Sequence, residues 1–139
     1  MFITDEDYRV VIGDSALKVV SQTSAENRSN AEAEAQEEIA SYLRPVYDCN
    51  SIFTAEGTAR NRLIVMYTCD IALYHMVSAM PQKLGSEIRK ERYERAVKWL
   101  EGVQAGKIIP DLPLAVDEAG DTMSPGMILS SQKPLRHNW

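Results

Sequence analysis

Asp70 and His75 are the two residues of this sequence that most resemble an acid-base pair, in which a carboxylate and an imidazole exchange a proton. Both lie in the apolar stretch 63–77, which we expect to be helical. Five helical residues correspond to about 500°, so the two side chains would point about 140° apart around the axis. We therefore expect no acid-base pair here. A buried Asp70 is expected instead to accept hydrogen bonds from an Arg or Tyr of a neighbouring helix.

Metal ligands do not cluster along the chain. His75 and His137 are the only histidines and lie in unrelated segments. Asp117, Glu118 and Asp121 are close together, but they lack the alternating ligands and the full loop length of a calcium site. We interpret them as a solvated acidic turn and expect no metal.

Cys49 and Cys69 are the only cysteines and form no CxxC pair, so neither a zinc site nor a disulfide framework is indicated. Both are expected to be reduced thiols, with Cys69 in the core. The glycine-rich motifs of nucleotide binding and the G-x-S-x-G motif of serine hydrolases are absent from the sequence. We therefore expect no cofactor and no enzymatic activity.

Length, composition and charge narrow the class of protein. The chain has 139 residues, of which 45% are hydrophobic and 25% charged, as in one ordinary globular domain. A net charge of -5 and a pI near 5.0 argue against a free-standing nucleic-acid-binding protein, which needs a basic face. The sequence has no apolar run of about 20 residues and no basic leader. We expect a soluble, cytoplasmic protein with no membrane partner.

Hydrophobic periodicity predicts four main helices. Thr4, followed by Asp7 three residues later, is expected to cap the first helix, which Gly13 interrupts. The polar residues 21–30 predict a loop that offers several alternative helix caps. A second, Ala- and Glu-rich helix follows and ends before Pro45.

The second half of the chain is predicted to begin with a connection over residues 48–61. Residues 63–77 are apolar nearly all the way round, which is typical of the buried central helix of a bundle. A fourth helix begins near Ser86 and ends at Gly106, where a left-handed conformation favours glycine. The expected fold is all-α: a compact helical domain over residues 1–112, with an extended C-terminal arm over residues 113–139.

The fourth helix is amphipathic. Its apolar residues recur at steps of three and four and predict one apolar stripe, Tyr93, Ala96, Val97, Leu100 and Val103. The charged residues between them are expected to face water: Arg92, Glu94, Arg95, Lys98 and Glu101.

The amino-acid sequence of this helix also resembles that of a known protein family. Residues 92–100, Arg-Tyr-Glu-Arg-Ala-Val-Lys-Trp-Leu, followed by Ala-Gly-Lys-Ile at 105–108, resemble the last helix of the phage Mu-type head-tail connectors, also called neck or adaptor proteins. The Phe-Ile-Thr-Asp-Glu-Asp start and the pairing of residues 39–47 with 70–75 are similar to the same family. The resemblance spans roughly residues 1 to 110.

This resemblance implies a structural protein of a phage or prophage that docks between the portal ring and the neck or tail-completion proteins. Such a protein would form a ring with copies of itself around the DNA channel, with DNA only as passing cargo. It would be located in the virion neck, and in the bacterial cytoplasm before assembly. A small helical binding or regulatory module, possibly dimeric, is the alternative.

Interface candidates follow from charge and from aromatic residues. Basic residues crowd the start of the fourth helix, an unfavourable place for cations, and a solvated face or pairing with the acidic second helix, within or between subunits, would explain them. Trp99, Tyr93 and Tyr42 are either core aromatics or intersubunit contacts. The candidates in the helices are Arg89, Arg92, Arg95, Trp99, Glu34 and Glu38.

The C-terminal arm is longer than the connections that a compact domain leaves without structure. It is either disordered or ordered by another chain. Its apolar anchors and cations are the remaining interface candidates: Met127, Ile128, Leu129, Lys133, Arg136 and Trp139.

Overall fold

Two short helices open the chain. The computed structural model describes residues 1–79 and 86–125, and it begins with α1 (Asp5–Ile12) and α2 (Asp14–Gln22). Gly13, with a φ of 84°, separates them. The Thr4 hydroxyl accepts a hydrogen bond from the Asp7 N–H, and the Asp7 carboxylate accepts one from the Thr4 N–H at 2.7 Å. This capping box confirms the predicted start of the first helix.

Arg60 ties this N-terminal region to a distant part of the chain. Its guanidinium donates to the backbone oxygen of Phe2 at 2.7 Å and to both carboxylate oxygens of Asp7. The Arg60 and Asp7 side chains are only 14% and 13% exposed. Because the pair is shielded and bidentate, it is stronger than an ordinary surface ion pair.

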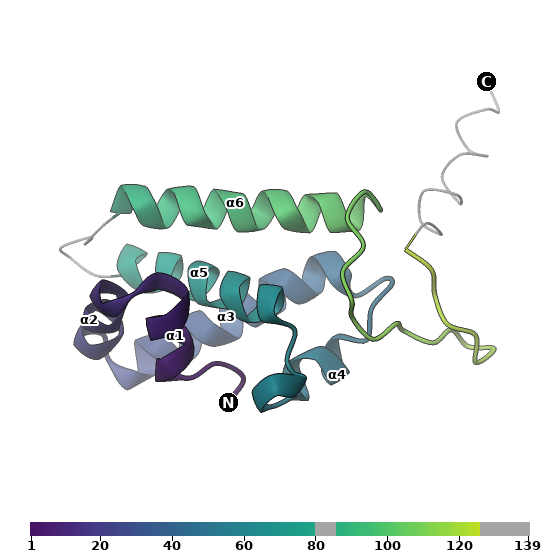
Figure 1. Ribbon diagram of the computed structural model, residues 1–139, viewed down its shortest axis with the longest axis horizontal. Helices are drawn as coiled ribbons and strands as arrows, with labels where there is room; N and C mark the ends of the chain where they lie inside the picture. The colour runs from purple at the N-terminus through teal and green to yellow at the C-terminus, as the bar shows by residue number, and fades with distance from the viewer. Residues whose placement is uncertain (80–85, 126–139) are drawn as a thin grey trace, which may run out of the picture.

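Three long helices form the body of the fold (Figure 1). They are α3 (Ala25–Leu43), α5 (Arg62–Ser78) and α6 (Ser86–Gln104). α5 packs against α3 and α6, and also against α1 and α2. It therefore occupies the centre, as its uninterrupted apolar sequence predicts.

The core is centred on α5. Ile64, Cys69, Ile71 and Leu73 have no exposed surface, and Leu100 of α6 is equally buried. The predicted core position of Cys69 is thus confirmed. None of the helices in residues 1–79 and 86–125 combines the length and the apolar character needed to cross a membrane.

Two predicted connections are wrong. Residues 21–30 are not a loop, because α3 already begins at Ala25, where the Ser24 hydroxyl accepts a hydrogen bond from the Asn27 N–H at 3.1 Å. Residues 48–61 contain α4 (Cys49–Thr54), capped by Asp48, and the 3-10 turn η1 (Gly57–Ala59). In both places a capping side chain starts a helix in a segment too polar or too short to show hydrophobic periodicity.

The end of α6 is confirmed as predicted. Gly106 has a φ of 76°, its N–H donates to the carbonyl of Val103, and the N–H of Lys107 donates to the carbonyl of Gly102. This pair of hydrogen bonds is a Schellman motif, which satisfies carbonyls at the helix end.

The chain after α6 returns to the body of the fold. The Asp48 N–H donates to the carbonyl of Pro113, and the Ala115 N–H donates to the carbonyl of Val46. Leu114 forms an isolated bridge with Tyr47, so the beginning of the predicted arm lies along the turn between α3 and α4. A second isolated bridge joins Val116 and Thr122. The remaining regular structure in the described residues is helical, which confirms the all-α fold class.

Candidate interaction surfaces

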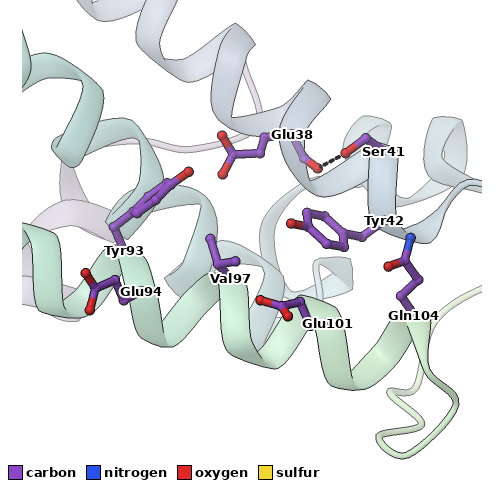
Figure 2. A pocket seen from close by; sticks show the side chains of 8 residues that line it. All are labelled: Glu38, Ser41, Tyr42, Tyr93, Glu94, Val97, Glu101 and Gln104. Carbon is purple, nitrogen blue, oxygen red and sulfur yellow. Dashed lines mark hydrogen bonds between the residues drawn. The ribbon is translucent and has the colours of Figure 1, made fainter.

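A groove of about 610 Å³ lies between α3 and α6 (Figure 2). At about 100° per helical residue, the α6 positions that line it fall on one flank of that helix. α3 supplies the opposite wall. The lining residues are Tyr93, Glu94, Val97, Glu101 and Gln104 from α6, and Glu38, Ser41 and Tyr42 from α3.

The groove is acidic. Three carboxylates, those of Glu38, Glu94 and Glu101, line it, and its lining includes no Lys or Arg. Glu38 Oε1 lies 3.5 Å from His75 Nε2, whereas Glu38 Oε2 is buried and has no hydrogen-bond partner in the part of the chain that the structure describes. Glu38 therefore lies at the buried side of the groove, whereas Glu94 and Glu101 are exposed.

Its aromatic wall is held in place. The ring of Tyr93 stacks on that of Tyr74, with centroids 4.2 Å apart and an interplanar angle of 17°. Burial, followed by the neighbouring Glu38 carboxylate, raises the pKa of Tyr93 to about 12. At neutral pH the groove therefore presents neutral phenol groups beside carboxylates.

The opposite flank of α6 has different chemistry. Ile88, Arg92, Arg95 and Trp99 recur at steps of four, three and four, and lie roughly half a turn around α6 from the groove. Ile88 is 51% exposed and Arg95 is exposed. Trp99 is half-buried against Tyr67, with ring centroids 4.9 Å apart. We call Ile88, Arg92, Arg95 and Trp99 the arginine flank.

Asp70 anchors this flank from α5. Its Oδ1 accepts a hydrogen bond from Arg92 Nε at 2.6 Å, and the side chains are 1% and 23% exposed. Burial raises the pKa of Asp70, while the hydrogen bond and charge of Arg92 oppose this rise. The predicted structural role of Asp70 is confirmed. The expectation that Arg92 faces water is wrong, because Arg92 turns inward to neutralise this buried acid.

Arg89 is also buried rather than solvated. It is 9% exposed, and its Nη1 has no hydrogen-bond partner among the described residues. It lies on the same side of α6 as Ala96, Leu100 and Val103, all of which are in the core. Burial and the charge of Arg92 lower the pKa of Arg89. Arg95, by contrast, is exposed as expected.

Sequence comparison identifies the family to which these surfaces belong. Residues 2–127 match the family described as "Bacteriophage Mu, Gp36". The chain belongs to this family. It is a phage protein, and its membership indicates a structural or assembly protein of the phage. No curated protein and no solved structure matches the chain.

In this member of the Mu Gp36 family, the acidic residues of α3 are not paired with the basic residues of α6. Glu32 binds Arg28 of its own helix, and Glu37 binds Arg44 just beyond its end. Glu34 is exposed. Within residues 1–79 and 86–125, no ion pair joins α3 to α6, so pairing between the two helices inside one subunit does not explain the candidates.

The acidic residues near the end of the described chain form a turn. Asp117 Oδ1 accepts hydrogen bonds from the N–H groups of Ala119 and Asp121, each at 2.9 Å. Asp117, Glu118 and Asp121 are all exposed, as predicted for a solvated turn. The described residues contain no group of three or more His, Cys, Asp or Glu side chains placed to hold a metal ion.

The remaining interface candidates lie outside the described residues: Met127, Ile128, Leu129, Lys133, Arg136 and Trp139. Sequence reasoning missed the groove, because Glu94 and Glu101 were expected only to face water and Val97 only to be apolar. Their steps of three and four, continued by Gln104, were the signal that they share one flank.

Proposed function

We propose that the chain is a structural head-tail connector of a tailed phage. It docks between the portal ring and the next neck or tail component and forms a ring of identical subunits around the DNA channel. Its place is the virion neck, and before assembly it resides in the cytoplasm of the bacterial host. It catalyses no reaction, and DNA is cargo that passes through the ring.

The match of residues 2–127 to the Mu Gp36 family carries this proposal. The surfaces of α6 support it, since the acidic groove and the arginine flank are different and lie on opposite sides of one helix. A ring built from head-to-tail contacts requires two non-identical surfaces on each subunit.

The net charge of -5 fits the proposed passage of DNA. Phosphates bind where cations displace their counterions, so an acidic lumen would let the duplex move without adhering. A ring whose lumen proved strongly basic would contradict this part of the proposal.

The test is deletion of the gene from a phage that carries it, followed by electron microscopy of the lysate. We expect filled heads and separate tails that fail to join, and joined particles when the gene is supplied in trans. Normal virions from the deletion strain would refute the proposal.

The mass of the purified protein, measured alone and with the portal protein by native mass spectrometry, tests the ring. A ring-sized oligomer, or one formed on the portal, supports the connector. A stable two-fold dimer that ignores the portal would instead favour a small helical binding or regulatory module.

A further inference from the structure

We propose that the groove between α3 and α6 receives the arginine flank of a second copy of the chain, with Arg95 and Trp99 as the inserted side chains. This inference rests on the proposed ring assembly and assigns the surfaces that would build it. The contact would be heterologous: the groove of one subunit holds the flank of the next.

The geometry of α6 favours repetition of this contact. Groove and flank lie roughly half a turn apart around the same helix, so a subunit whose groove is filled still presents its own flank. Each addition therefore leaves one free surface of each kind, until the ring closes.

The arginine flank is complementary in charge to the acidic groove. Arg92 is neutralised by Asp70, but Arg95 is exposed and forms no ion pair within the described residues. Across the contact it would meet Glu101 and Glu94, both exposed in the isolated subunit. Glu94 has one long, exposed ion pair of its own, with Lys90 Nζ at 3.9 Å, which contributes little in water. Opposite charges on the two surfaces steer association and fix its orientation.

The groove also offers geometry that suits a guanidinium. Carboxylates accept paired hydrogen bonds from Arg, and the faces of Tyr42 and Tyr93 are attractive to a cation. The exposed carboxylates of Glu94 and Glu101 line the same groove as the two rings, so a guanidinium could contact a ring and a carboxylate together. Trp99 is half-buried beside Tyr67. Tryptophan is one of the residue types that most often contribute a large share of the binding energy at interfaces.

The test is charge reversal followed by mixing. Arg95→Glu reverses the flank, and the double variant Glu94→Arg/Glu101→Arg reverses the groove. The matched controls are Lys98→Glu for the flank and the double variant Glu87→Arg/Glu91→Arg for the groove, which make the same charge changes at exposed positions of α6 outside both surfaces. Circular dichroism checks that each variant folds, and sedimentation equilibrium measures self-association at low salt.

We expect each reversal to weaken self-association by about ten-fold or more, while the controls stay close to the wild type. An equimolar mixture of the two reversed proteins should associate again, because only contacts between unlike variants then bring opposite charges together. The inference is overturned if the mixture associates no better than its components. It is equally overturned if the reversals act no more strongly than the controls, or if the wild type remains monomeric up to about 1 mM, the limit of weak binding.

A parallel portal-binding measurement separates this inference from the proposed function. If the reversed variants lose self-association and regain it on mixing, but the wild type does not bind the portal protein, the proposed interface is supported and the proposed connector function is refuted. If the wild type binds the portal protein but the reversals do not affect self-association, the connector function is supported and the proposed interface is refuted.

Discussion

Replacing Arg92 by Met should destabilise the fold by about 3 kcal/mol at pH 7. The substitution leaves the carboxylate of Asp70, whose side chain is 1% exposed, without its hydrogen-bonded partner. At the observed contact of 2.6 Å, an effective dielectric constant of about 20 gives an attraction of about 6 kcal/mol. Removing one member of a buried pair costs about 3–5 kcal/mol in practice. The positive charges of Arg89 and Arg95 also stabilise the Asp70 carboxylate. We therefore expect a cost at the lower end of this range.

The pH dependence of this cost follows from the pKa of Asp70. Burial raises that pKa and Arg92 opposes the rise, so loss of Arg92 raises the pKa further. An acid whose pKa is higher in the folded state stabilises the fold below its unfolded pKa of about 3.9 and loses this contribution as the pH rises through its folded pKa. The penalty of Arg92→Met should therefore be largest at neutral pH and should shrink as the pH falls and Asp70 takes up its proton.

Urea unfolding at pH 7 and pH 5 measures this, at concentrations low enough to keep the protein monomeric. The double variant Asp70→Asn/Arg92→Met should be more stable than Arg92→Met alone, because no charge then remains buried without its partner. Lys98→Met, an exposed control on the same helix, should change stability by less than about 0.5 kcal/mol. A cost for Arg92→Met below about 1 kcal/mol, or one equal at both pH values, would refute this reasoning.

Three further predictions concern stability. Gly106→Ala should cost about 1–2 kcal/mol in urea unfolding, because φ is 76° there, whereas Gly106→Asn should cost less; equal costs would argue against backbone strain. Thr4→Ala should lose about 1 kcal/mol with the cap of α1 while Thr4→Ser retains most of it, and a neutral Thr4→Ala would show that the capping box contributes nothing. Burial raises the pKa of Tyr8 and raises that of Tyr93 to about 12. Stability should therefore fall as the pH rises above the usual tyrosine value of 10.0, where the unfolded chain ionises first; the fall should be smaller in Tyr8→Phe, and its absence up to pH 12 would contradict the buried, protonated tyrosines.

The long helices were predictable because the spacing of their apolar residues indicates which positions are buried. The apolar sequence of residues 63–77 can only be a buried element, and it became α5, the centre of the fold. Thr4 and Gly106 were predictable for the same reason: each satisfies a local requirement of a helix end.

The start of α3 and the whole of α4 were not predictable from periodicity. Their first residues are polar, and their helical state depends on single capping side chains, Ser24 and Asp48. The same residue types also favour loops and turns. The choice between the two is made by tertiary contacts that a single sequence does not display.

The candidate surfaces were predicted only in part. Sequence reasoning expected basic and acidic edges, but it treated the arginines of α6 as equivalent. The structure separates them: Arg89 is buried with the core, Arg92 serves Asp70, and Arg95 alone of the three is exposed. Which arginine meets which acid depends on how α6 is rotated against α5, and the hydrophobic stripe defines this rotation only to within about one residue position.

Asp7 has a further consequence for how the N-terminal region forms. The same carboxylate completes the capping box of α1 and binds Arg60 from the segment that precedes α5. An isolated α1 of eight residues is too short to be stable in water. Because one side chain serves both the helix end and the long-range contact, the coil-to-helix transition of α1 and its attachment to the body are expected to occur as a single cooperative event.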